Sequence, residues 1–110
     1  MKRILIVVGL SILLCGCNNS NNDLKSLMEA NEYVIVDVRS EEEYTESHII
    51  GATNIPYDEI DQNTKLDKDK LILVYCKSGR RSSVAFQELK KLGYDVYDLG
   101  AYSQIDMPKE

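Results

Sequence analysis

The sequence lacks an apolar run long enough to cross a membrane, an excess of positive charge, and the length for a second hydrophobic core. The longest apolar stretch, residues 4–14, has 11 residues, whereas a membrane-spanning helix needs roughly 20. The formal net charge is -5, and it falls to -7 if Lys2 and Arg3 are removed with the N-terminus. This acidic balance disfavours binding to nucleic acid, whose phosphates select basic surfaces. A chain of 110 residues has room for one small domain.

The N-terminus has the pattern of a secretory signal. Lys2 and Arg3 precede the apolar stretch 4–14, and a polar run, residues 18–22 (NNSNN), follows Cys17. Such a segment is expected to be processed rather than to form part of the fold. An ordinary secretory peptide in which Cys17 is incidental is the alternative to a lipid-attachment signal.

Residues 14–17 (LCGC) resemble a bacterial lipobox, with Leu14 three residues before Cys17 and the small Gly16 directly before it. The resemblance implies cleavage after Gly16 and lipidation of Cys17. The protein would then be exported and anchored, through two or three acyl chains, to the outer side of the cell membrane or in the periplasm. The expected organisation is a signal peptide over 1–16, a lipidated Cys with a polar tether over 17–22, and a folded domain over 23–110.

Apolar runs and helical patterns alternate along the rest of the chain. Buried parallel strands are typically continuous and β-branched, as the run 33–38 (YVIVDV) is. Further strands are expected over 53–55, 71–75 and 95–99, and helical segments over 24–28, 40–47, 57–60 and 82–92, the last capped by Gly93. Residues 40–43 (SEEE) form a capping-box pattern. The order predicts an α/β domain with a mainly parallel sheet of about four to five strands, flanked by helices.

Cys76 follows the second long apolar run and would be the only thiol left after processing, so no internal disulfide is expected. In parallel sheets, functional groups gather where a strand ends and a loop leads into a helix. The loop here consists of Lys77, Ser78, Gly79, Arg80, Arg81 and Ser82. Its backbone N–H groups, its helix end and its three cations would all favour a thiolate. A small buried filler is the alternative role for Cys76.

Residues 76–82 (CKSGRRS) resemble the active-site loop of rhodanese-domain sulfurtransferases, in which a Cys opens a short loop that an Arg closes. The resemblance extends over about residues 23–105. It includes 36–39 (VDVR), 43–44 (EY), 48–52 (HIIGA), 54–56 (NIP), 92–94 (LGY), 96–97 (VY) and 99–100 (LG).

The resemblance implies that the Cys76 thiolate takes a sulfur from a donor anion such as thiosulfate and passes it to cyanide or a thiol. Backbone N–H groups of residues 77–82 would stabilise the persulfide, Lys77 and Arg81 would neutralise donor oxygens, and Arg80 would face solvent. No metal or organic cofactor is required, and a monomer is expected. We interpret Asp37 and Arg39 as a structural ion pair.

Two departures from the family pattern concern the rim of the site: Ser47 stands where Gly is usual, and residues 100–105 (GAYSQI) replace a stretch that ends in Trp. His48 is expected in a packing turn. A catalytically silent, membrane-anchored module that binds a partner is one alternative function. A Cys-based phosphatase is another, but that class has one more residue in the loop than the four between Cys76 and Arg81.

Overall fold

The computed structural model describes residues 20–110. The chain divides into two units after residue 30. The described part of the first unit is helix α1 (Ser20–Ala30), which includes the helical segment expected over 24–28. Within the described part of the chain, no helix combines the length and apolar character that a membrane crossing requires. The predicted signal peptide and the lipidation site Cys17 lie outside the described residues.

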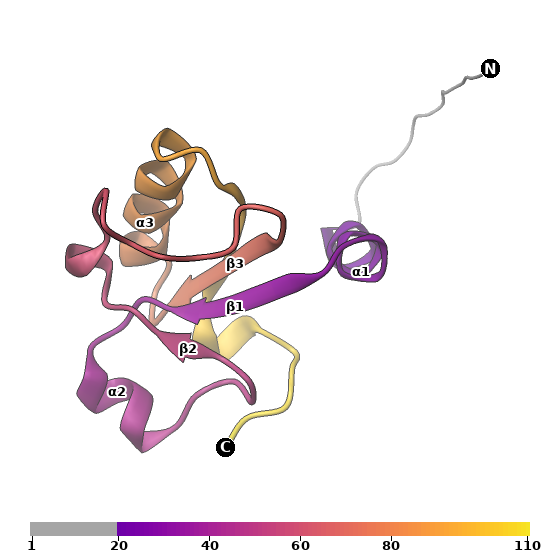
Figure 1. Cartoon of the computed structure of the whole chain (residues 1–110). Coiled ribbons are helices and arrows are strands. Elements are labelled where there is room, and N and C mark those ends of the chain that lie inside the picture. Colours follow the sequence, from indigo (N-terminus) through magenta and orange to yellow (C-terminus); the bar gives the residue numbers. More distant parts are fainter. Residues whose placement is uncertain (1–19) are drawn as a thin grey trace. The chain divides into compact units, whose positions relative to one another are not determined.

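The second unit is built on a parallel sheet (Figure 1) with the strand order β2-β1-β3-β4. Every strand pairs in parallel with its neighbours, which confirms the predicted α/β class with four strands. The strands are β1 (Tyr33–Asp37), β2 (Thr53–Asn54), β3 (Leu71–Cys76) and β4 (Asp95–Ala101). Both β3 and β4 extend beyond the predicted ends, so Cys76 is the last strand residue rather than the first loop residue.

Helical segments follow the strands as predicted, although their bounds differ by one or two residues and the last 3-10 turn was not predicted from the sequence. The elements are α2 (Glu41–Glu46), α3 (Arg80–Lys91) and the 3-10 turns η2 (Tyr57–Glu59) and η3 (Tyr102–Gln104). The capping box at α2 is confirmed, because the Glu43 amide donates to Ser40 Oγ and the Ser40 amide donates to Glu43 Oε1. Helix α3 begins at Arg80 instead of Ser82, so the loop after Cys76 is shorter than the sequence predicts.

The core places the end of β3 between two packed faces. All six residues of β3 are buried, and Cys76 belongs to a cluster that includes Val74 on its strand and Ala85 and Leu89 on α3. Because successive side chains of a strand point to opposite faces, Tyr75 lies on the other side of the sheet. Its ring stacks on Tyr102 with the ring centroids 5.5 Å apart. The position of Cys76 is therefore fixed by packing on both faces.

A buried ion pair at the end of β1 is joined to β3 by a hydrogen bond from Tyr75. Asp37 is fully buried and Arg39 is 5% exposed, and Arg39 Nη2 lies 2.6 Å from Asp37 Oδ2. Tyr75 donates its hydroxyl to the same carboxylate oxygen at 2.8 Å, and burial raises the pKa of Tyr75, so the phenol keeps its proton as a donor. The structural ion pair predicted for Asp37 and Arg39 is confirmed.

The segment after η3 returns to the turn before β2 and pairs with it. The His48 amide donates to the Glu110 carbonyl at 2.9 Å, and the Ile50 amide donates to the Pro108 carbonyl at the same distance. The His48 ring stacks on Tyr44 with the ring centroids 3.9 Å apart. His48 thus lies in a packed turn, as predicted.

Candidate active site

Cys76 stands at the carboxyl end of β3, where a three-residue loop, 77–79, leads into α3. Gly79 closes this loop with φ 102°, a backbone conformation that residues with a side chain rarely adopt. The Gly79 amide points toward the thiol, and its nitrogen lies 3.0 Å from Cys76 Sγ. The loop is therefore shaped around the sulfur atom.

The surroundings of Cys76 favour the thiolate over the thiol. Burial raises the pKa of Cys76, but hydrogen bonds from the Ser82 side chain and from the backbone of Ser82, Gly79 and Ser78 outweigh it, so the pKa is lowered overall. Hydrogen bonds to a charged form favour that form. The same donors can hold the terminal sulfur of a persulfide. This arrangement provides a nucleophile and a cradle for the anion that it forms.

Cys76 is fully buried, with 0% of its surface exposed. A molecule from solvent can therefore reach Sγ only when the atoms around it move. Lys77 and Ser78, which come next in the chain, are exposed. The loop thus presents its polar side to solvent while the sulfur stays beneath it.

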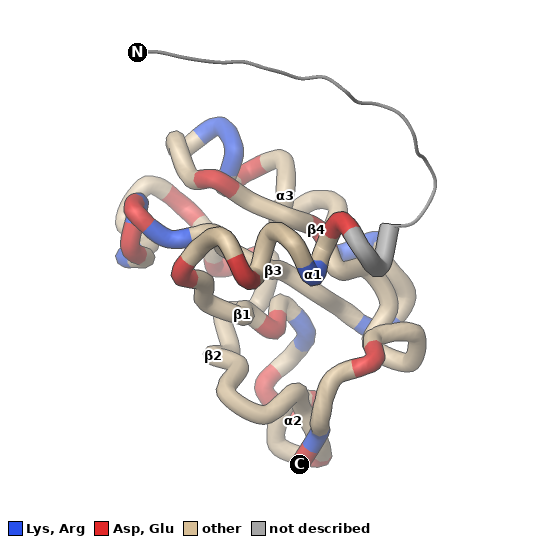
Figure 2. The backbone as a smooth tube through the Cα atoms, turned by 90° about the vertical axis from the view of Figure 1, so that its right-hand side faces the viewer, with Lys and Arg blue, Asp and Glu red and all other residues tan. Residues whose placement is uncertain are grey.

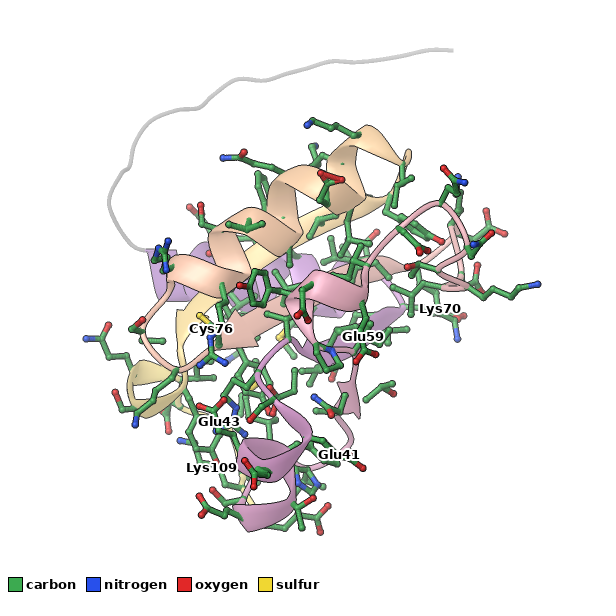
Figure 3. All side chains as sticks on the ribbon, turned by 90° about the vertical axis from the view of Figure 1, so that its left-hand side faces the viewer. Glu41, Glu43, Glu59, Lys70, Cys76 and Lys109 are labelled. Carbon is green, nitrogen blue, oxygen red and sulfur yellow. The ribbon has the colours of Figure 1, made fainter. Side chains whose placement is uncertain are left out.

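The six residues that the sequence proposes around Cys76 lie in the loop 77–79 and the first turn of α3. Their side chains differ in exposure and in partners. Lys77, Ser78 and Arg80 are exposed, and solvent exposure is what we expected for Arg80. Ser82 is buried, and its single hydroxyl proton can be donated either to Cys76 or to the Gly79 carbonyl oxygen, which lies 3.2 Å from Ser82 Oγ. Cys76 and the acidic helix α2 are visible together in Figure 3, where Glu43 is labelled.

Arg81 has a partner that the sequence analysis missed. Its Nη1 and Nη2 donate to Glu43 Oε1 and Oε2 at 2.8 and 3.1 Å, so the guanidinium fork that the resemblance assigns to the donor is paired with a carboxylate of α2. The available signal was the capping box, which fixes the direction of the Glu43 side chain. Sequence alone does not show that α2 and α3 present these ends to each other.

Charges of both signs are interspersed along the described backbone (Figure 2). Among residues 20–110 there is no group of three or more His, Cys, Asp or Glu side chains placed to hold a metal ion. At the candidate site itself, the groups that the structure describes are the Cys76 thiol with its lowered pKa, the backbone donors around it, and the cations Lys77, Arg80 and Arg81.

Comparison with known proteins places the chain in a family. Residues 20–105 match the sequence pattern of the rhodanese-like domain. The chain belongs to the rhodanese-like domain family. It is 38% identical over 78 residues to the thiosulfate sulfurtransferase PspE of Escherichia coli, a match that covers 67% of this chain and 75% of the relative. The thiosulfate sulfurtransferase GlpE of Coxiella burnetii is 36% identical over 75 residues, covering 66% and 70% of the two chains.

Solved rhodanese structures share the fold. A rhodanese with anions from E. coli superposes with a TM-score of 0.65 at 36% identity, over 71% of this chain and 96% of that chain. A rhodanese-related protein from Thermoplasma volcanium gives a TM-score of 0.67 at 31% identity, over 81% and 92%. The four-stranded parallel sheet with flanking helices is therefore a rhodanese-like fold.

The two departures from the rhodanese pattern contact each other. Tyr102, in the stretch that replaces one ending in Trp, donates its hydroxyl to Ser47 Oγ at 3.0 Å. Ser47 also offers its carbonyl to Arg39 Nη2 at 2.6 Å, and the Arg39 guanidinium carbon lies 4.3 Å from the Tyr102 ring centroid. The two unusual residues thus complete one network around the buried ion pair.

Proposed function

We propose that this rhodanese-like domain is a sulfurtransferase that moves a sulfane sulfur from a donor such as thiosulfate to cyanide or a thiol through a persulfide on Cys76. The observation that carries the proposal is the contact between the Gly79 amide and Cys76 Sγ at 3.0 Å, within a loop that lowers the pKa of that thiol. The relatives named above, called thiosulfate sulfurtransferases, support the same substrate class.

In the first step the Cys76 thiolate attacks the outer sulfur of thiosulfate. A new S–S bond forms at Cys76, the S–S bond of the donor breaks, and its electron pair leaves with sulfite. In the second step cyanide attacks the terminal sulfur of the persulfide, giving thiocyanate and restoring the thiolate. Neither step consumes an external oxidant or reductant, so the thiol and the two substrates suffice.

The loop supplies the electrostatic support for these steps. Backbone N–H groups between residues 77 and 82 are fixed before the reaction, and fixed donors stabilise charge that develops at a reacting atom. Lys77 and Arg80 add positive charge on the solvent side, where a donor anion arrives. The four residues between Cys76 and Arg81 make a tighter loop than the one that a Cys-based phosphatase wraps around phosphate.

Intact mass analysis of the full chain after treatment with thiosulfate tests the proposal. We expect the wild type to gain the mass of one sulfur atom and to lose it again when cyanide is added. The Cys76→Ser variant should gain nothing, which assigns the sulfur to this residue rather than to Cys15 or Cys17. A wild type that gains no sulfur under these conditions would favour a silent module that binds a partner.

We further propose that the domain is held outside the cytoplasm by a lipid on Cys17. The supporting observation is the lipobox-like sequence 14–17 followed by the polar run 18–22. The Cys17→Ser variant is expected to appear in the soluble fraction when cells are fractionated, whereas the matched Cys15→Ser variant should stay with the membrane. Retention of the Cys17→Ser protein at the wild-type level would contradict the anchor.

A further inference from the structure

The Arg81 guanidinium and the Glu43 carboxylate form a two-pronged ion pair beside the candidate active site. Both nitrogens of the fork are engaged, at 2.8 and 3.1 Å, and only about a quarter of each side chain is exposed. A fork-to-fork pair of this kind is stronger than a single contact because two parallel hydrogen bonds accompany the charge attraction. Glu43 therefore neutralises most of the positive charge of Arg81.

Helix α2 holds Glu43 in place for this contact. The amide and the hydroxyl of Ser40 both lie 3.0 Å from Glu43 Oε1, the oxygen that also receives Arg81 Nη1. The hydrogen bond with Arg81 is the largest cause that lowers the pKa of Glu43 to about 2. Glu43 is thus ionised throughout the neutral pH range, and its carboxylate is anchored on a separate helix.

The pair lies within electrostatic reach of the sulfur. The pKa of Arg81 is raised, first by its hydrogen bond with Glu43 and also by its interaction with the charge of Cys76. Three cations surround the loop, namely Lys77, Arg80 and Arg81, and Glu43 neutralises the one that is most buried among them. The charge that a donor meets near Cys76 is therefore smaller than the loop sequence implies.

We propose that Glu43 sets the charge preference of the site: by neutralising Arg81, it lowers the preference of the loop for dianionic donors such as thiosulfate relative to singly charged donors such as organic thiosulfonates. The proposal rests on the sulfur transfer proposed above. Glu43 acts here through Arg81 and is a positioning residue, not a group that touches the donor. Its removal is expected to strengthen the site for thiosulfate.

Methanethiosulfonate is the matched donor, because it carries the same outer sulfur on a group with one negative charge fewer. The Cys76 thiolate attacks that sulfur, the S–S bond breaks, and the electron pair leaves with methanesulfinate. One unscreened charge at several ångströms changes the capture of a monoanion by about threefold and of a dianion by about tenfold, since the effect scales with the donor's charge. The ratio of the two donors' kcat/KM values therefore reports the charge of Arg81.

Glu43→Gln keeps the size of the side chain and removes its charge. We expect it to raise kcat/KM for thiosulfate about threefold more than kcat/KM for methanethiosulfonate, mainly through KM. Glu42→Gln is the matched control: Glu42 is an exposed neighbour on α2, and its variant should keep the wild-type ratio. An equal loss of kcat/KM with both donors would show that Glu43 only holds the loop together. An equal change of the donor ratio in Glu42→Gln would show that the overall charge of α2, and not the contact with Arg81, sets the preference. Either result overturns the proposal.

If Glu43→Gln does not fold, as judged by circular dichroism, Glu43→Asp replaces it. The shorter side chain keeps the charge in α2 but withdraws it from Arg81, so the donor ratio must still rise, by less than for Gln. An unchanged ratio in the folded Asp variant contradicts the proposal.

A second readout does not depend on sulfur transfer. Alkylation of Cys76 by iodoacetate, an anion, is compared with alkylation by neutral iodoacetamide, measured on the peptide that contains Cys76 in the full chain. The ratio of the two rates cancels any change in thiolate fraction, and Glu43→Gln should raise it about threefold. If neither donor transfers sulfur while this ratio rises, the proposed function fails and the role of Glu43 stands. If sulfur is transferred and the ratio does not rise, the role of Glu43 fails.

Discussion

A Cys76→Ser variant is expected to lose all transfer of sulfur from thiosulfate to cyanide while remaining folded. A serine hydroxyl fits the same space and can accept the hydrogen bond from the Gly79 amide that Cys76 Sγ accepts at 3.0 Å. It cannot form a persulfide, so the first step has no product. Thiocyanate production measures the loss, and circular dichroism shows whether the sheet and helices persist. Residual turnover in a folded variant would mean that the sulfur passes through another group.

The pH dependence of alkylation tests the reason for this reactivity. Because the pKa of Cys76 is lowered, its thiolate exists at lower pH than that of a free cysteine, whose pKa is about 8.5. We expect the rate of alkylation of the Cys76 peptide by iodoacetamide to reach half of its maximum below that pH. Burial of Cys76 slows its alkylation at every pH by limiting access. The pH at the midpoint of the profile, and not the absolute rate, therefore tests the prediction. A midpoint at or above about 8.5 would contradict the role assigned to the loop.

The sequence predicted the parts of the site that are contiguous in the chain. A buried strand, a thiol, a glycine and a helix follow one another over residues 71–92, and their geometry depends mainly on local rules: strand burial, a turn that needs glycine, and a helix end that supplies N–H groups. The six-residue run of β3 and the positive φ of Gly79 arise in this way. Local order was therefore enough to place Cys76 at a strand end.

The missed contact joins residues that are 38 positions apart. Arg81 reaches Glu43 because α2 and α3 both begin at the carboxyl ends of neighbouring strands, β1 and β3. The charge pattern of each helix gives no indication of which acidic residue of α2 faces which basic residue of α3. Tertiary packing decides this choice, and so the neutralisation of Arg81 could not be predicted.

The pairing of the C-terminal segment is another non-local feature. Residues 108–110 pair with 48–50 through backbone hydrogen bonds, and backbone groups carry no information about their partner in the sequence. The contact between Tyr102 and Ser47 at 3.0 Å likewise joins two positions that seemed to be independent departures. Together these contacts close the region around Asp37 and Arg39.

Replacing Asp37 by alanine is expected to lower the free energy of unfolding by about 3 to 5 kcal/mol, because it leaves a buried guanidinium without its counter-charge. Asp37 receives the Arg39 backbone amide, the Arg39 Nε and Nη2 groups, and the Tyr75 hydroxyl, all between 2.6 and 3.0 Å. Such a loss is a large part of the roughly 5 to 15 kcal/mol that stabilises a small domain. Urea unfolding followed by circular dichroism measures it.

The pair of Glu88 and Lys91, 3.8 Å apart with side chains 42% and 75% exposed, provides the control, since Glu88→Gln should change stability by less than about 0.5 kcal/mol. Arg39→Ala should cost nearly as much as Asp37→Ala. The double variant should cost less than the sum, because the second substitution removes the charge that the first leaves unpaired. Additive losses would show that the two residues stabilise the fold separately. Non-additive losses would show that Asp37 and Arg39, the pair to which Tyr75 donates its hydroxyl, stabilise the fold as one coupled unit.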